Sequence, residues 1–170
     1  DVSGEVIDQT DAFTYRLGQG MKRPLPAQPT DPLEKTDGAL RIMGWNAKRN
    51  AIFIHREPVV RTLRAIDPDI VLMQELVDGV TADRLQSFFE AELGWEHARI
   101  ILGAGTAGGD LHCAIVSRYP LGNIEPLTLV TLENQPDRTV RAVGAIAEIG
   151  TRRLLVVSVH LKCCGSKGGR

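Results

Sequence analysis

The sequence LRIMGWNAKRNAIFIHREPVVRTLRAIDPDIVLMQEL, residues 40–76, decides how the rest of the chain is interpreted. Residues 40–45 and 69–74 are apolar runs of strand length, and the second run follows a turn signal. Between them, Pro58 suits the first turn of a helix, and Pro68 ends that helix. The intervening apolar residues recur at helical spacing on one face: Val59, Val60, Leu63 and Ile66. The stretch therefore predicts a strand, a helix and a second strand.

Polar side chains stand at the carboxyl ends of both predicted strands. Asn46 follows the first strand, and Glu75 follows the second. Strands joined by a helical crossover lie parallel in one sheet, so these two ends emerge at the same edge, where open α/β sheets bind ligands. Mg²⁺ prefers one or two carboxylates together with phosphate oxygens. Asn46 and Glu75 are therefore candidate members of a divalent-metal site.

The composition fits one ordinary folded domain. The chain has 170 residues, of which 43% are hydrophobic, and a domain of roughly 150 residues buries about 70% of its unfolded surface. The formal net charge of −1 gives no global attraction to nucleic acid or acidic membranes, so phosphate binding requires a local cluster. No apolar run reaches the roughly 18 residues of a transmembrane helix, and no signal-peptide pattern opens the sequence. The 3 cysteines do not form a disulfide framework.

The N-terminal stretch differs in character from the rest of the chain. Residues 1–38 are polar and rich in proline, which predicts an extended arm or linker, and residues 39–170 are predicted to be the folded part. Residues 80–93 have the spacing of another amphipathic helix, and Gly94 lies just past its end. Short strands are then predicted at residues 97–102, 111–117, 124–132, 140–149 and 153–161.

A glycine-rich stretch, GAGTAG at residues 103–108, matches the dinucleotide-binding pattern G-x-G-x-x-G. In that motif the glycines open a helix whose N-terminus holds a pyrophosphate. Here a predicted strand, residues 111–117, follows instead. We therefore interpret the stretch as a loop between two strands.

Further candidate residues come from the later strands. His160 ends an apolar strand, where a lone histidine is usually structural. A histidine that faces a carboxylate can instead serve as a proton donor or stabilise charge during phosphodiester cleavage. Arg141 begins a predicted strand, and arginine is the usual bidentate partner of phosphate. Lys48 and Arg49 could add phosphate contacts, although surface charge is the simpler interpretation.

Taken together, these pieces resemble the endonuclease/exonuclease/phosphatase superfamily, to which pancreatic deoxyribonuclease belongs. The resemblance spans residues 40–162 and consists of five pieces in order: WN at 45–46, DIVLMQE at 69–75, AIVSRYP at 114–120, Arg141 and VHL at 159–161. It implies an α/β fold, a four-layer α/β/β/α sandwich of the deoxyribonuclease-like type. It also implies a phosphodiesterase or phosphatase, nuclease-like in character, that depends on Mg²⁺ or Mn²⁺.

The resemblance assigns a role to each candidate residue. Glu75 would ligate the metal, and Asn46 would orient that carboxylate and contact metal-bound water or phosphate. Arg141 would hold a phosphate oxygen, and His160 would assist the leaving group or the transition state. The substrate stays open among nucleic acid, a phospholipid head group and a small phosphoester, and the sequence indicates no protein partner.

The sequence departs from the family pattern in its second half. The family's Asp-x-Asn and terminal Ser-Asp-His motifs are absent. The chain is therefore expected to be the N-terminal half of such a domain, truncated at Arg170 and inactive alone. The alternative hypothesis is a non-catalytic binding or interaction domain that keeps the fold. Metal binding near Glu75 distinguishes the two, because only the enzyme requires it.

Overall fold

The computed structural model describes residues 33–77, 79–103, 111–123, 131–132, 135–139 and 141–160, with the backbone alone at 123, 131–132 and 135–139. The chain divides into two compact units, Asp1–Glu34 and Lys35–Arg170, and the helices and strands below lie in the second. The arm predicted at residues 1–38 falls almost wholly outside the described residues. Within the described ranges, each helix is too short or too polar to span a membrane.

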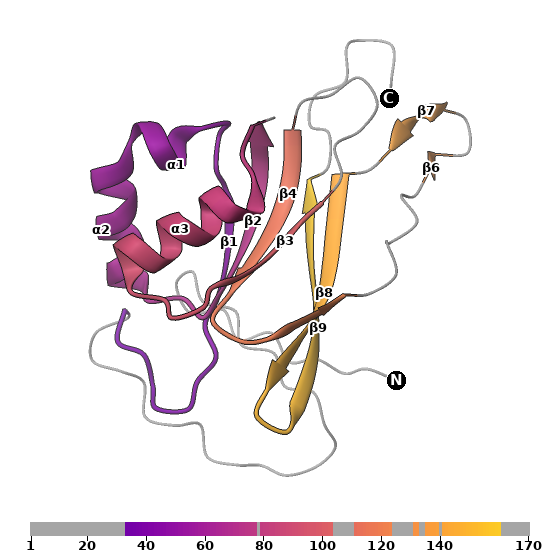
Figure 1. The fold of residues 1–170 in the computed structure, drawn as a ribbon. Helices are drawn as coiled ribbons and strands as arrows, with labels where there is room; N and C mark the ends of the chain where they lie inside the picture. Colours follow the sequence, from indigo (N-terminus) through magenta and orange to yellow (C-terminus); the bar gives the residue numbers. More distant parts are fainter. Residues whose placement is uncertain are drawn as a thin grey trace. The chain divides into compact units, whose positions relative to one another are not determined.

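A four-stranded sheet forms the centre of the second unit (Figure 1). In spatial order its strands are β1 (Ile42–Asn46), β2 (Ile70–Val77), β4 (Leu111–Ser117) and β3 (Arg99–Leu102). β1 and β2 are parallel, which confirms the strand, helix and strand prediction. β4 runs antiparallel to both β2 and β3. The carboxyl ends of β1 and β2 therefore lie beside the amino end of β4.

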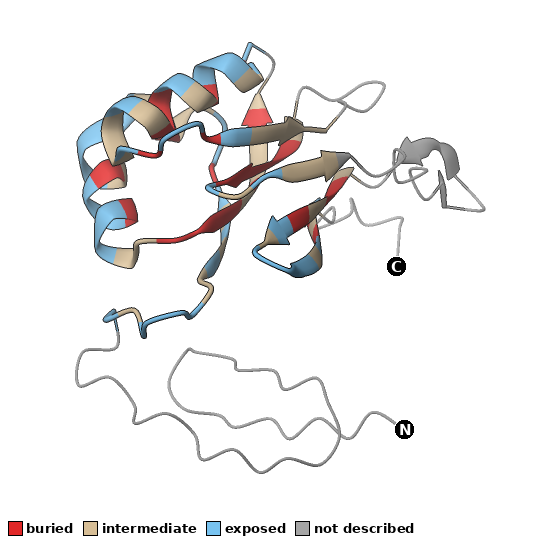
Figure 2. Ribbon diagram, turned by 60° about the horizontal axis from the view of Figure 1, so that its bottom comes forward, coloured by how far each residue is buried: buried red, intermediate tan, exposed pale blue. Residues whose placement is uncertain are grey.

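Two helices, α2 (Arg56–Ile66) and α3 (Ala82–Leu93), cover one face of this sheet (Figure 1). A one-turn helix, α1 (Ala51–Ile54), precedes α2 and was not predicted. Figure 2 shows that buried and exposed residues recur along both α2 and α3, as expected for helices with one face on a core. The helices contribute the following residues to the core beneath them: Val60, Leu63, Leu85, Phe88 and Phe89.

Local sequence signals explain where the helices begin and end. Asp67 adopts a left-handed φ of 48° at the C-cap of α2, directly before Pro68. Thr81 caps α3, because its hydroxyl accepts a hydrogen bond from the Arg84 N–H at 3.2 Å. Gly94 ends α3 with a φ of 66°, which confirms its predicted place just past the helix.

A second sheet packs on the other face of the first. Its antiparallel strands are β5 (Leu121–Asn123), β8 (Arg141–Ile149) and β9 (Arg152–His160), in the order β5-β8-β9. A two-stranded ribbon, β6 (Thr131–Leu132) and β7 (Gln135–Thr139), comes between β5 and β8 in the chain. The core between the sheets contains Ile70, Cys113, Ile115, Val143, Ala145, Ala147 and Val156.

The layer order of the described elements is helices, sheet and sheet. This confirms the predicted α/β sandwich and supplies three of its four layers. The second helix layer is not among the elements that the structure describes. Among the described elements, helices therefore cover the outer face of the first sheet, and no layer covers the outer face of the β5-β8-β9 sheet.

Candidate active site

The ends of four strands bring the predicted site residues to one edge of the sandwich. Asn46 ends β1, and the parallel register places it beside Gln74, the residue before Glu75. In the second sheet, Arg141 begins β8 and His160 ends β9, and the antiparallel register places these two residues opposite each other. β2 also contacts β9 across the interface between the sheets. The candidate residues of both sheets therefore meet.

Glu75 and His160 form the centre of this edge. The Glu75 Oε1 atom lies 3.1 Å from His160 Nε2, and the two side chains are 26% and 17% exposed. Their expected proximity is confirmed, whereas the roles assigned to them stay predictions. Partial exposure leaves both groups accessible to a ligand that arrives from solvent.

Arg141 approaches the other side of the His160 ring. Its Nη1 atom lies 3.5 Å from His160 Nδ1. A guanidinium can only donate hydrogen bonds, so this contact favours an Nδ1 without a proton and places the ring proton on Nε2. Nε2 then donates to the Glu75 carboxylate. Carboxylate, imidazole and guanidinium thus stand in a row, with the imidazole held from both sides.

A bulge in β2 positions the Glu75 carboxylate. The pairing of β2 with β4 shifts between Met73 and Leu76, and Glu75 has a left-handed φ of 59°. Strict alternation would place residues 73 and 76 on opposite faces of the sheet, yet both are buried in the core beneath the helices. Glu75 absorbs this offset as the extra residue of the bulge. Bulges beside active sites re-aim side chains in this way.

The loop after β1 is hydrogen-bonded to the backbone of β2 at the bulge. The Ala47 N–H donates to the carbonyl of Gln74 at 2.8 Å, and the Arg49 N–H donates to the carbonyl of Glu75 at 2.7 Å. Lys48 and Arg49 have left-handed backbone conformations, with φ of 40° and 65°, as Glu75 does. Such conformations cost on the order of 1–3 kcal/mol each and gather at functional sites.

Asn46 is exposed at this edge, and its side chain folds back onto the loop. Its Oδ1 atom accepts a hydrogen bond from the Lys48 N–H at 2.9 Å, which forms an Asx turn. The oxygens of Glu75 and Asn46 are the hard donors that Mg²⁺ prefers, and an amide oxygen keeps a second lone pair. Among the described residues, no group of three or more His, Cys, Asp or Glu side chains is arranged to hold a metal ion. Glu75 and Asn46 therefore supply oxygen donors of the kind that Mg²⁺ prefers, and their role as metal ligands stays a prediction.

Cys113 lies between the sheets close to this edge and is 1% exposed. Its Sγ atom donates to the Arg141 carbonyl at 3.5 Å. Burial raises the pKa of the Cys113 thiol, and the opposing effects of Ser158, the His160 backbone and the Arg141 charge do not cancel this increase. Cys113 therefore stays a thiol within the core and is not an activated nucleophile.

Two polar residues beside the site were missed by the sequence analysis, Gln74 and Ser158. The Gln74 Nε2 atom donates to Ser158 Oγ at 2.9 Å, and Ser158 is buried. A signal for them exists, because each interrupts an otherwise apolar strand within two residues of a candidate site residue.

Two further sequence features stay untested as parts of a phosphate site. The glycine-rich stretch at 103–108 follows β3 in the chain, and its interpretation as a loop stays a prediction because residues 104–110 lie outside the described residues. Lys48 and Arg49 are exposed at the edge, and their contribution to phosphate binding stays a prediction.

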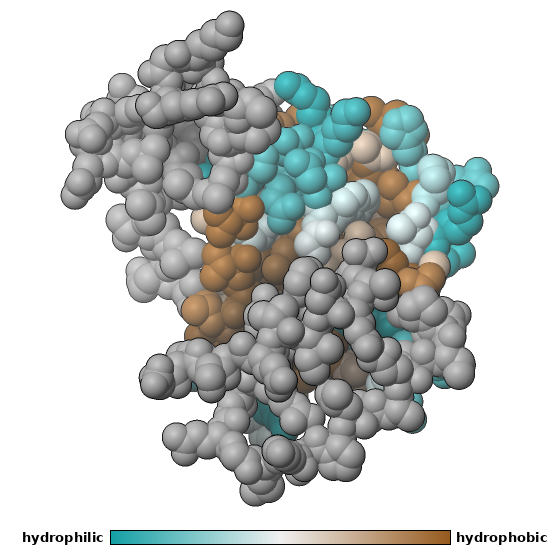
Figure 3. Space-filling view, turned by 180° about the vertical axis from the view of Figure 1, so that it is seen from behind, coloured by the Kyte–Doolittle hydropathy of each residue, from teal (hydrophilic) through white to brown (hydrophobic). Residues whose placement is uncertain are grey.

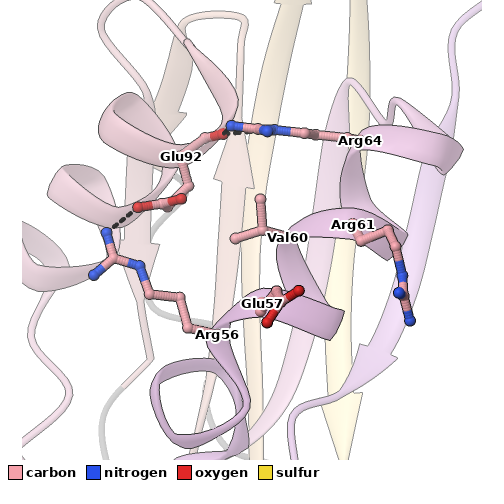
Figure 4. Close-up of a pocket in the computed structure, with 6 residues that line it drawn as sticks. All are labelled: Arg56, Glu57, Val60, Arg61, Arg64 and Glu92. Atoms are coloured by element: carbon pink, nitrogen blue, oxygen red, sulfur yellow. Dashed lines mark hydrogen bonds and ion pairs between the residues drawn. The ribbon is translucent and has the colours of Figure 1, made fainter.

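An open hollow of about 500 Å³ lies on the helix layer (Figure 4). Arg56 pairs with the Glu92 carboxylate, and Arg64 donates to the Glu92 carbonyl from Nε at 3.0 Å and from Nη2 at 2.6 Å. These arginines tie α2 to α3. The hollow is therefore explained by helix packing and contains none of the candidate site residues.

The sequence matches no family model and no curated protein. The fold, however, matches solved structures. TDP2 from Caenorhabditis elegans aligns with a TM-score of 0.51 and 17% identity over 74% of this chain and 36% of that chain. An endonuclease/exonuclease/phosphatase from Beutenbergia cavernae aligns with a TM-score of 0.51 and 22% identity over 75% of this chain and 39% of that chain. An endonuclease/exonuclease/phosphatase family protein from Leptotrichia buccalis gives 0.50 and 16%, over 73% of this chain and 55% of that chain.

These alignments establish the fold. The chain has the α/β sandwich of endonuclease/exonuclease/phosphatase proteins, as the sequence resemblance implied. It spans 36% to 55% of the length of these three solved chains. At identities of 22% or less the likeness concerns architecture alone, so an account of the chemistry must rest on the site residues.

Proposed function

We propose that this chain forms part of a divalent-metal-dependent hydrolase of phosphoester bonds, which acts by in-line attack of water at phosphorus. The observation that carries the proposal is the 3.1 Å contact between Glu75 and His160, with Arg141 on the far side of the imidazole. A carboxylate, a proton donor and a guanidinium at one sheet edge suit a phosphate group, its cation and its developing charge. Two of the structurally similar proteins, the endonuclease/exonuclease/phosphatase proteins from Beutenbergia cavernae and Leptotrichia buccalis, support the same class of chemistry.

Mg²⁺ or Mn²⁺ is the cofactor that these donors fit. Glu75 would hold the ion, and Asn46 lies at the neighbouring strand end with a second hard oxygen. When bound, the ion supplies positive charge that polarises a phosphoryl oxygen. The remaining ligands would be water and the substrate.

The chain's own side chains each have a task on the phosphate. Arg141 binds a phosphate oxygen, because a guanidinium offers donors that match phosphate geometry. In this structure the single Nε2 proton of His160 faces the Glu75 carboxylate. Once that carboxylate binds the ion, the Nε2–H would donate to a phosphate oxygen and stabilise the negative charge that builds up during attack. Before the substrate and the ion bind, Glu75 holds the ring in this orientation through the Nε2 contact.

Substitution of Glu75 by Gln tests this assignment in the natural full-length protein. Turnover of a chromogenic phosphodiester at saturating Mg²⁺ or Mn²⁺ should fall at least about 100-fold, because the amide keeps the shape and loses the charge that a hard cation requires. Glu96→Gln is the matched control, since Glu96 is exposed on the turn before β3 and lies outside the site. The control should keep the wild-type rate, and Arg141→Ala should mainly raise KM.

Equal turnover by the wild type and Glu75→Gln at saturating metal would contradict the role given to Glu75. A full-length protein that binds neither ion and hydrolyses no phosphoester would support the alternative of a non-catalytic binding domain. A panel of single-stranded DNA, a phospholipid and a small phosphoester then separates the three substrate classes, because each presents the same phosphate chemistry on a different scaffold.

A further inference from the structure

A buried hydrogen-bonded link joins the two sheets just inside the site edge. The Ser158 Oγ atom donates to the Met73 carbonyl at 2.8 Å and accepts from Gln74 Nε2 at 2.9 Å. Gln74 Nε2 also donates to the Leu72 carbonyl at 2.9 Å. Ser158 is 1% exposed and its bond to the Met73 carbonyl is buried, whereas the two bonds of Gln74 are partly buried. A side chain of β9 is thereby bonded both to the backbone and to a side chain of β2.

Each end of this link is attached next to one member of the candidate catalytic pair. Gln74 is the residue directly before Glu75. Ser158 is two residues before His160 on the same face of β9, since strand side chains alternate. A shift of the link would therefore move the carboxylate relative to the imidazole.

Hydrogen bonds across the interface between the sheets align the two sheets more closely than apolar packing does. β2 and β9 belong to different sheets, so no backbone ladder fixes their relative position. Most of the core between the sheets is apolar, and apolar packing is non-directional. Hydrogen bonds of 2.8 and 2.9 Å restrict both distance and direction. The link is thus well suited to set the register between the strands that carry the pair.

We propose that Gln74 and Ser158 are positioning residues, whose hydrogen bond sets the geometry between Glu75 and His160 that phosphoester hydrolysis requires. This proposal rests on the proposed function and adds two residues that act through their neighbours. A misplacement of about 1 Å can cost a reaction on the order of 100-fold. Loss of the link should therefore lower kcat while KM changes little.

Two variants of the full-length protein remove the link in different ways. Ser158→Ala deletes the hydroxyl, and Gln74→Met keeps the side-chain length and deletes the donor. We expect kcat to fall about 10- to 100-fold in each, with KM within about threefold. The double variant should be about as slow as Ser158→Ala alone, because Ser158→Ala already removes the contact with Gln74 as well as the bond to the Met73 carbonyl. Ser158→Thr keeps the hydroxyl and should restore most of kcat.

Ser117→Ala is the matched control for a purely structural effect. Ser117 is 0% exposed, and its hydroxyl accepts from the Tyr119 N–H at 2.9 Å at the opposite end of β4. This variant should lower Tm about as much as Ser158→Ala and leave kcat unchanged. Equal loss of kcat in both serine variants would show that Ser158 acts through stability alone and would overturn the proposal.

An NMR measurement separates the link from the proposed reaction. A nuclear Overhauser effect between the Glu75 Hγ protons and His160 Hε1 should appear in the wild type and in Ser117→Ala, and should weaken or vanish in Ser158→Ala and Gln74→Met. This result in a protein that hydrolyses no phosphoester would support the link and contradict the proposed function. Variants that keep both the Overhauser effect and kcat would overturn the link.

Discussion

The two sheets share one core but differ in how far they are covered. The β1-β2-β4-β3 sheet lies between helices on one face and the second sheet on the other, and residues such as Met73 and Ile115 are fully buried. In the β5-β8-β9 sheet the inward-facing Val156 is 5% exposed, whereas Leu155 and Val159 on the outer face are 60% and 42% exposed. Seen from behind, apolar side chains reach the surface (Figure 3).

This difference shows that an apolar sequence pattern does not by itself tell whether another layer packs on a strand. The run LLVVSV in β9 is apolar on both faces, which is typical of a strand covered on both sides, as β2 and β4 are. Among the described elements, only the inner face of β9 has a covering layer. Sensitivity to substitution should therefore follow the observed cover and not the hydrophobicity of the residue.

The largest effect is expected in the core that the two sheets share. Ile115 of β4 is 0% exposed and packs between the sheets. Ile115→Ala should lower the free energy of unfolding by about 2–5 kcal/mol, because it removes buried methyl groups and leaves a cavity. Urea denaturation measures this loss. A cost below about 1 kcal/mol would show that the sheets do not pack together in solution as described.

A smaller effect is expected at the opposite edge of the first sheet, where Asp67 precedes β2. Arg118 Nη2 lies 2.5 Å from Asp67 Oδ1, and Lys35 Nζ lies 3.7 Å from Oδ2. Burial raises the pKa of Asp67, but the hydrogen bond and charge of Arg118, with the charges of Lys35 and Arg41, outweigh it and lower the pKa below its ordinary value of 3.8.

The lowered pKa gives the sign of a pH effect. The Asp67 carboxylate stabilises the fold above its unfolded pKa, and this contribution disappears as the pH falls through the lower, folded pKa. Asp67→Asn should therefore lose less stability than the wild type between about pH 5 and pH 2. Urea midpoints across this range measure the difference, which should be small because the side chain is 43% exposed. If the urea midpoints of the wild type and of Asp67→Asn fell equally as the pH was lowered, the assignment would be contradicted.

The smallest effect is expected on the outer face of the second sheet. Leu155→Ala should change the free energy of unfolding by no more than about 0.5 kcal/mol, since the side chain already lies largely in solvent. Ile115→Ala is its matched comparison, because both variants shorten an aliphatic side chain within a strand. A loss of about 2 kcal/mol at Leu155 would break the comparison and show that something covers this face in solution.

Much of the fold follows from periodicity and strand-end rules. The strand predicted at 111–117 coincides with β4, and the helix predicted at 80–93 begins within two residues of α3. The meeting of Glu75 and His160 followed from placing both at strand ends. The strand predicted at 124–132 stays a prediction, because residues 124–130 are outside the described residues.

Tertiary requirements explain what the sequence could not predict. The bulge at Glu75 has no local signal such as glycine, because it arises from the burial of both Met73 and Leu76 on one face. The Gln74–Ser158 link joins residues that are 84 positions apart, and no local pattern encodes such a partner. The four-residue helix α1 is too short to show a helical period.

The central claim is that Glu75 and His160 face one metal-assisted phosphoester site. Titration of the full-length protein with Mn²⁺, followed by NMR, tests it most directly, because this ion broadens the signals of nearby nuclei. The account predicts selective broadening at Glu75, Asn46 and His160, its loss in Glu75→Gln and its persistence in Glu96→Gln. Signals at this edge that stay sharp at saturating Mn²⁺, or that broaden equally in Glu75→Gln, would contradict it.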